Sequence, residues 1–484
     1  MKGLALKTLD WLEGKVDYAD VRVVEGDDEE VSTRNGTVEA LGQTNSLGIG
    51  VRVLVKGRWG FAATSNLERK AIQRTVQKAL EVASASTLVK GEKTKLAPVS
   101  RIKNGHYQTP CQKDPFQVSL QKKIEILLKA DRLMRKKGEV KVAQGFFRCF
   151  RERKIFASTE GTLINQEILA TGGGIEATAV ENGEVQNRSY PNSFRGQFQT
   201  GGWEIFEKLD LPAQAERVAE EAEALLTAKN CPTGEFDIIL DGPQVALQVH
   251  ESCGHPTELD RVLGSEISYA GGSFLKPEGL WKFQYGSPIV NITADATLPG
   301  GLGTFGFDDE GVPAQRFYLV KNGVHVGYLT SRETAYKTGL TPNGTMRAQS
   351  WADLPLIRMT NINLEPGSWK LNDLIAETKK GILMSVNKAW SIDDQRINFQ
   401  FGCEWGQEIK HGKLGRIFKN PSYTGITPKF WGSCDAICSK DHWQAWGTPN
   451  CGKGEPSQTM YVAHGAAPAR FRKVQVGMMK GDER

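Results

Sequence analysis

The chain contains 484 residues, of which 39% are apolar and 24% are charged. These proportions exclude an intrinsically disordered chain, and the length exceeds what one hydrophobic core usually serves, so two or more domains are expected. The net charge of +5 is small for this length, and we interpret the densest basic run, residues 129–141, as the solvated end of a helix. Direct binding to nucleic acid is therefore not expected.

The sequence lacks the marks of a membrane or secreted protein. No stretch of about 18 uninterrupted apolar residues is present. Near the N-terminus, Asp10 and Glu13 stand where the apolar core of a secretory signal would continue. The eight cysteines are irregularly spaced, which favours reduced thiols or metal ligands over a disulfide framework. These features predict a cytoplasmic protein.

The first 230 residues alternate between strand and helix patterns and predict an N-terminal α/β domain. The Asn35-Gly36 pair separates two strand-like runs and is a strong hairpin signal. Ser65 and Glu68 stand in capping-box positions before an amphipathic pattern. The predicted strands are 19–26, 31–40, two within 49–65, and a strand-rich part at about 139–203. The predicted helices are 65–84, 117–137 and about 212–229.

The pattern changes after residue 230, so we predict a second domain over 231–484. A short buried strand at 235–242 leads into a helix over 243–255, with Pro243 in its first turn. The segments that follow are mostly strand-like: 288–298, 316–331, 382–390 and 396–418. One strong helix among many strands predicts a mostly antiparallel barrel or sandwich. The expected fold class is thus α+β.

The predicted helix over 243–255 carries the motif H-E-S-C-G-H, from His250 to His255. Zinc peptidases commonly use H-E-x-x-H, in which both histidines share one helix face. Here the spacing is one residue longer, which would place the side chains about 140° apart on a regular helix. Gly254 allows unusual backbone angles and Pro256 disfavours the α region at His255. We therefore predict that the helix widens or ends between Cys253 and Pro256, so that both histidines face one ion.

A metal site needs further residues, and the sequence leaves alternatives open. Two histidines do not hold a catalytic zinc, so a third ligand is required, and Cys451 lies in a turn-rich Gly/Pro loop that can bring a thiolate close. Glu251 would then act as a general base. Alternatively, His250 lies on an apolar helix face and His255 in a loop, with no metal bound.

Other sulfur atoms could take part in metal binding. Cys434 and Cys438 read as buried thiols on a short helix. A separate structural zinc site built from Cys434, Cys438, His442 and Cys451 is the second interpretation. Cys253, inside the motif, is a competing ligand.

Several segments together resemble the TldD/PmbA family of metallopeptidases and modulators of DNA gyrase. They are HESCGH at 250–255, DDEGVPAQ at 308–315, TPKFWGSCDAICS at 427–439, TPNCGKGEP at 448–456 and HGAAPARF at 464–471. The resemblance implies an N-terminal α/β domain and a C-terminal barrel-like domain, with zinc held by His250, His255 and Cys451 and Glu251 as general base. Ser252, Cys253 and Pro256 depart from the H-E-A-V-G-H-G common in bacterial members.

The resemblance also implies partners. Family enzymes cleave unfolded peptides, which they hold as an added strand in a cavity enclosed by a dimer. A homodimer, or a heterodimer with a metal-free paralogue, is therefore expected. Two functions follow: a zinc-dependent peptidase, or a peptide- or partner-binding scaffold acting on gyrase or a toxin–antitoxin system, with a structural zinc. Glu251 beside a ligand favours the peptidase, since a structural site does not use it.

Overall fold

The computed structural model describes residues 1–136, 138–193 and 195–477. Lys137, at the end of the helix predicted over 117–137, and residues 478–484 of the predicted second domain lie outside the described residues. In the part of the chain that is described, no helix is both long and apolar enough to cross a membrane.

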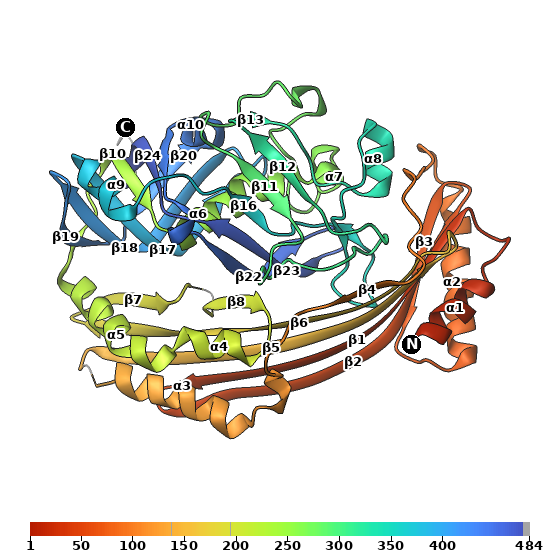
Figure 1. Ribbon diagram of the computed structural model, residues 1–484, viewed down its shortest axis with the longest axis horizontal. Coiled ribbons are helices and arrows are strands. Elements are labelled where there is room, and N and C mark those ends of the chain that lie inside the picture. The colour runs from red at the N-terminus through yellow and green to blue at the C-terminus, as the bar shows by residue number, and fades with distance from the viewer. Residues whose placement is uncertain (137, 194, 478–484) are drawn as a thin grey trace.

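Four long strands form the centre of the first sheet and run beneath the C-terminal half of the chain (Figure 1). Its strand order is β3-β2-β1-β5-β6-β4, and β7 and β8 also pair with β6. The long strands are β1 (Tyr18–Arg34), β2 (Thr37–Val55), β5 (Val140–Ser158) and β6 (Leu163–Glu181). The shorter strands are β3 (Arg58–Thr64), β4 (Gly105–Gln108), β7 (Glu184–Tyr190) and β8 (Gln197–Thr200).

Five helices cover this sheet and create two separate apolar cores. One core joins β1 and β2 to α1 and α2, and the other joins β5 and β6 to α3, α4 and α5. The helices are α1 (Lys2–Asp10), α2 (Arg69–Ser86), α3 (Leu120–Met134), α4 (Trp203–Leu209) and α5 (Leu211–Thr227). The predicted capping box is wrong: α2 begins four residues after Ser65, because the Asn66 side chain accepts a hydrogen bond from Glu68 N and forms a turn first.

The C-terminal half contains a closed barrel of five strands. Its order is β17-β10-β24-β20-β18, and the pairing of β17 with β18 closes the ring. Only β10 and β17 run parallel within it. The barrel strands are β10 (Gly234–Leu240), β17 (Lys380–Ile392), β18 (Asn398–Lys410), β20 (Ser422–Ile426) and β24 (Ala469–Val476). The mixed α+β class is thereby confirmed, whereas the division at residues 230 and 231 stays a prediction.

Smaller strands and helices surround the barrel. β9 (Lys229–Asn230), β19 (Lys413–Lys419) and β21 (Cys434–Ile437) extend its sheet. The other sheets contain β11 (Ile292–Asp295), β12 (Arg316–Lys321), β13 (Val324–His325) and β16 (Ile362–Leu364); β14 (Met346–Arg347) and β15 (Leu356–Ile357); and β22 (Gln444–Lys453) and β23 (Gln458–Ala466). The helices are α6 (Gly242–Val249), α7 (Leu259–Val262), α8 (Arg332–Thr338), α9 (Leu371–Glu377) and α10 (Thr427–Gly432). Figure 1 shows β22 and β23 between the barrel and the long sheet.

Candidate metal centre

The helix that carries the H-E-S-C-G-H motif changes its winding at His250. After α6, residues His250–Gly254 form a π-helical turn, and the N–H of His255 donates to the carbonyl of His250. A π turn takes up one more residue than an α turn, so the two histidines lie on the same side. Their rings are 5.0 Å apart and nearly perpendicular. The widening that the spacing demands is therefore present, but it begins at His250 rather than after Cys253.

The expected cause of this widening is wrong in two respects. Gly254 has φ −63° and ψ −66°, and His255 has φ −58° and ψ −43°, so both are right-handed helical and neither needs unusual angles. Pro256 lies at the start of a 3-10 turn, His255–Thr257, where its missing N–H is not needed. Glycine is required at position 254 for space, because a Cβ atom there would collide with Sδ of Met359.

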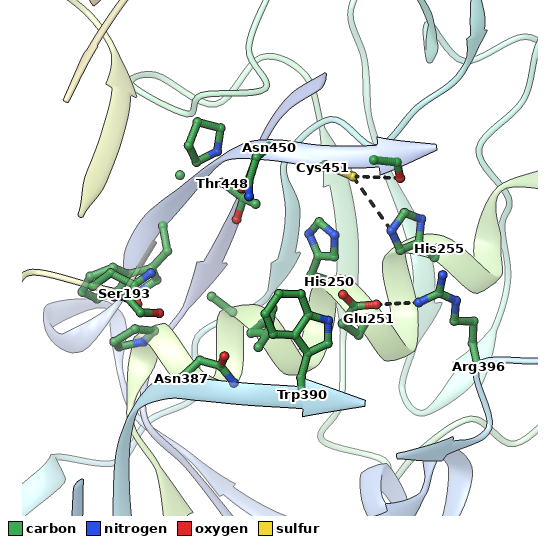
Figure 2. A pocket seen from close by; sticks show the side chains of 18 residues that line it. Ser193, His250, Glu251, His255, Asn387, Trp390, Arg396, Thr448, Asn450 and Cys451 are labelled. Carbon is green, nitrogen blue, oxygen red and sulfur yellow. Dashed lines mark hydrogen bonds and ion pairs between the residues drawn. The ribbon is translucent and has the colours of Figure 1, made fainter. Parts of the chain in front are cut away.

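Three predicted ligands meet at one point. Ligand atoms of His250, His255 and Cys451 all lie within 4.8 Å of one another. The first two come from the π turn and its end, whereas Cys451 comes from β22 (Figure 2). The Nε2 atom of His255 is 3.9 Å from Sγ of Cys451, and all three side chains are buried.

The competing sulfur ligands lie elsewhere. Cys253 packs in the apolar core, where its sulfur is 3.1 Å from the Tyr285 hydroxyl. Cys434 and Cys438 are buried as expected, but Cys434 begins β21 and Cys438 follows it, so the predicted short helix is wrong; pairing with β24 holds this segment extended. In the described residues no second group of this kind forms, so the alternative site with His442 is not built.

Hydrogen bonds on the far side of each ring define which nitrogen faces the cluster. Nδ1 of His464 lies 3.2 Å from the carbonyl of Ile362, so it carries the proton and Nε2 is an acceptor. That Nε2 is 2.7 Å from Nδ1 of His250, which must donate. Burial, followed by the neighbouring His250, lowers the pKa of His464 well below its usual value, in keeping with a neutral ring. The lone pair of His250 Nε2 is thus left for a ligand.

A buried charge network orients the other histidine. Nδ1 of His255 is 3.0 Å from a carboxylate oxygen of Glu258, and this carboxylate lies 3.5 Å from the ammonium of Lys453. Lys453 is fully buried and also pairs with Asp260 at 2.8 Å and Glu266 at 3.1 Å. Carboxylate–histidine pairs of this kind fix the orientation of metal-binding histidines and raise their basicity.

The electrostatics of the cluster favour a thiolate. Burial alone would raise the pKa of Cys451, but the adjacent His250, His255 and Arg358 act in the opposite direction and bring the pKa well below its ordinary value. Burial lowers the pKa of His255 well below its usual value, which keeps this imidazole neutral. Burial opposes a charge on His250, but the adjacent Cys451 and Glu251 raise the pKa of this imidazole above its usual value, so a metal ion would displace a proton that His250 shares with the thiolate. Two imidazoles and one thiolate form a donor set that suits a divalent transition-metal ion with one position left open. The residues present therefore fit a metal ion.

The carboxylate of Glu251 shares a cavity of about 270 Å³ with the three ligand residues. Figure 2 shows it opposite Arg396, whose Nη1 atom lies 2.6 Å from a Glu251 oxygen. Trp390 from β17 and Asn450 from β22 form other parts of the wall. The cavity thus combines a metal-binding group with a buried carboxylate held by a cation.

Sequence reasoning missed Arg396, His464 and Lys453 as parts of this site. Arg396 lies 145 residues from Glu251, and His464 lies 214 residues from His250. Of these three residues, His464 could have been predicted from the sequence, because the chain has only seven histidines and His464 begins a segment that resembles the family. Arg396 precedes β18 in a region with no chemical motif.

Models of one protein family match three parts of the chain. A PmbA/TldA metallopeptidase C-terminal domain matches residues 233–477, domain 1 of the same family matches 19–83, and its central domain matches 113–226. The chain belongs to this PmbA/TldD family.

Individual relatives support the same assignment. A metalloprotease from Methanocaldococcus jannaschii is 29% identical over 94% of this chain and 96% of its own. A metalloprotease TldD homologue from Haemophilus influenzae is 26% identical over 96% of this chain and 93% of its own. Together with the His-His-Cys cluster, these names imply a bound metal ion.

Solved structures of low identity show the shared fold alone. TldE from Thermococcus kodakarensis superposes with a TM-score of 0.74 at 16% identity, covering 98% of this chain and all of its own. A Thermotoga maritima protein whose name proposes modulation of a DNA gyrase superposes with a TM-score of 0.77 at 18% identity, over 98% of this chain and 99% of its own.

Proposed function

We propose that this chain is a zinc-dependent peptidase that hydrolyses unfolded or extended peptides. The observation that carries the proposal is the Glu251 carboxylate in the same cavity as the converging atoms of His250, His255 and Cys451. A structural metal site has no use for such a carboxylate. Three protein ligands with an open fourth position are the pattern of catalytic zinc sites.

In this proposal each residue has a defined task. His250, His255 and Cys451 hold zinc, which when bound acidifies water and polarises a carbonyl. Glu251 accepts a proton from the attacking water and returns it to the departing amine. Arg396 holds the Glu251 carboxylate in place through the 2.6 Å contact. His464 and Glu258 orient the two histidine rings.

The cavity also supports an extended substrate. Six consecutive residues of β22, from Gly447 to Gly452, line it. β22 pairs with β23 along one edge. The Gln197 side chain already bonds the carbonyl of Ala445 and the N–H of Gly447, so the backbone groups after Gly447 are the ones that can pair with a peptide as an added strand. Such main-chain pairing tolerates varied side chains, which suits unfolded peptides. The two-subunit assembly implied by the family stays a prediction.

A test compares the wild type with Glu251→Gln after both are loaded with zinc. We expect Glu251→Gln to retain one zinc per chain and to cleave unstructured peptides about 10²- to 10⁴-fold more slowly. Cys451→Ala should lose the metal. Equal cleavage by Glu251→Gln and wild type, or intact peptides after incubation with zinc-loaded wild type, would contradict the proposal. A scaffold with structural zinc predicts that Glu251→Gln changes nothing and Cys451→Ala sharply lowers the melting temperature.

A further inference from the structure

A second cavity of about 340 Å³ lies next to the metal cavity. The two share Pro449 and Asn450 of β22, which immediately precede Cys451. This pair forms the irregularity between Thr448 and Cys451 in the β22–β23 register. The second cavity is bounded by strands β5 and β6 on one side and by β14 and β23 on the other. The two cavities therefore meet at Pro449 and Asn450, beside Cys451.

Most charged groups in this second cavity already have ionic partners. Arg148 pairs with Asp28 at 2.6 Å. Lys154 pairs with Asp309 at 2.9 Å and with Glu152 at 3.0 Å.

Asp308 is the remaining carboxylate in the wall, and backbone groups saturate it. Its two oxygens accept hydrogen bonds from the backbone N–H groups of Glu310, Val312 and Met346. None of the acidic groups of this wall is therefore left to serve as the counter-ion of a further cation.

Arg347 differs from the other cations because it makes no ion pair with any described residue. Only 8% of its surface is exposed, and its Nη1 atom donates to the carbonyls of Met359 at 2.9 Å and Tyr461 at 3.0 Å. The guanidinium carbon lies 5.0 Å from the centre of the Phe305 ring. Within the described residues, Nε and Nη2 make no hydrogen bond. The guanidinium is thus held in a fixed orientation with two donors left for a ligand.

Burial is costly for a cation that no carboxylate contacts directly, and the negative groups Asp309 and Glu152 act on Arg347 only from a longer distance. Burial, reinforced by the nearby Arg358, lowers the pKa of Arg347 to about 10, so the group still carries its charge at neutral pH. The planar fork of an arginine matches the two oxygens of a carboxylate. A carboxylate at this position would supply both the missing charge and the missing acceptors.

We propose that the second cavity is a subsite for a carboxylate of the peptide, bound by Arg347. This inference rests on the proposed function, because the ligand is part of the same peptide that crosses the metal centre. The carboxylate can be the C-terminal group of the peptide or the side chain of an aspartate or glutamate, and both present the same two oxygens. Arg347 would then determine which peptides are preferred and where they are cut.

The test uses two matched pairs of unstructured peptides with zinc-loaded wild type. One pair differs only in a free or amidated C-terminus, and the other carries glutamate or glutamine at the same internal position, with amidated ends. Loss of a charge-assisted hydrogen bond predicts a kcat/KM about 10- to 100-fold lower for the uncharged member of one pair. The pair that shows this difference identifies the source of the carboxylate. Equal kcat/KM within both pairs would overturn the proposal.

Variants of Arg347 test whether this residue causes the preference for a peptide with a carboxylate. Arg347→Met should reduce the ratio within the responsive pair to about one, and Arg347→Lys should retain part of it. Arg148→Met is the matched control: this arginine lines the same cavity but is already paired with Asp28, so the ratio should persist. A preference that survives in Arg347→Met would overturn the assignment. Ratios are used because a partly unfolded variant loses activity equally on both peptides.

Measurements of peptide binding test the carboxylate subsite independently of peptide cleavage. Titration calorimetry of zinc-loaded Glu251→Gln with the same peptides should show the same preference in Kd without any cleavage. If wild type cuts no peptide but the Kd preference is present and depends on Arg347, the proposed peptidase activity fails and the carboxylate subsite stands. If peptides are cut without preference, the subsite fails and the peptidase stands.

Discussion

The Nδ1 atom of His250 lies 2.7 Å from Nε2 of His464, a residue 214 positions further along the chain. This contact joins the π turn to β23 and leaves the other nitrogen of His250 facing Cys451. The chain thus orients the first ring through a second histidine and the other ring through Glu258. Both histidines receive the outer support that metal ligands commonly have.

Replacing His464 should weaken metal binding without removing a ligand. In His464→Ala, Nδ1 of His250 loses its acceptor, and we expect the zinc affinity to fall about 10- to 100-fold. Competition with a chromophoric chelator measures this change. His106→Ala, an exposed histidine on β4, is the control and should bind zinc like wild type. An unchanged affinity in His464→Ala would show that the contact does not support the site.

Removing Lys453 should strongly destabilise the fold. This fully buried ammonium faces Asp260, Glu266 and Glu258, and its loss leaves their negative charge uncompensated. Breaking a buried charge network in this way costs about 3–5 kcal/mol, so Lys453→Met should lower the free energy of unfolding by that amount. Urea denaturation measures it. Arg34→Met, which breaks an exposed ion pair with Glu39, should cost less than about 1 kcal/mol. Similar values for both variants would refute the argument.

Local signals in the sequence predicted much of the first sheet. Asn35 and Gly36 both adopt positive φ in the tight turn between β1 and β2, as do Asn182 and Gly183 between β6 and β7. Such turns depend only on the residues within them. The apolar stripe of α5 was equally local, because Ala215, Val218 and other members of the stripe recur at helical spacing and are all buried.

Contacts between distant segments were beyond the sequence patterns. Two strand pairings of the barrel have no local signal in the sequence. They are the pairing of β17 with β18, which closes the barrel, and the parallel pairing of β10 with β17. In the metal site, too, the sequence predicted local features but not contacts between distant segments. The motif spacing predicted a widened helix, but it could not show that Gly254 lies against Met359, more than one hundred positions away. Arg396 meets Glu251 in the same way, through the fold alone.

The pH dependence of stability should reveal Glu404 at the contact between β18 and β7. Burial raises the pKa of Glu404 to about 7, although Arg188 and Ser189 act to lower it. The folded protein then holds a proton that the unfolded chain releases near its ordinary pKa of 4.5. This contribution is therefore largest at acidic pH and is lost as the pH rises to about 7. The loss amounts to on the order of 3 kcal/mol.

Glu404→Gln tests this directly, because the amide does not titrate. Urea unfolding at about pH 5 and about pH 8 should show a smaller loss of stability in the variant, by on the order of 3 kcal/mol. Glu13→Gln, at an exposed position after α1, should keep the wild-type difference. The same pH difference in Glu404→Gln and wild type would show that Glu404 does not carry the extra proton.

The close approach of Gly254 and Met359 should couple packing to metal binding. In Gly254→Ala the new Cβ meets Sδ of Met359, which is fully buried, so Met359 and the turn that ends at His255 must move apart. We expect a loss of about 1–3 kcal/mol in stability, as for other overpacked cores, and weaker zinc binding. Gly432→Ala is the control, since no atom lies within 4 Å of its added Cβ.

A double-mutant cycle distinguishes this collision from a backbone effect. Met359→Ala alone leaves a cavity and should cost about 2–5 kcal/mol. In the double variant the alanine at 254 occupies part of that space, so the combined loss should be smaller than the sum of the single losses by about 0.5–3 kcal/mol. The zinc affinity of the double variant should also exceed that of Gly254→Ala, because His255 can return toward His250 and Cys451. Additive losses in stability would mean that glycine is needed here for its backbone and not for the space that Met359 occupies.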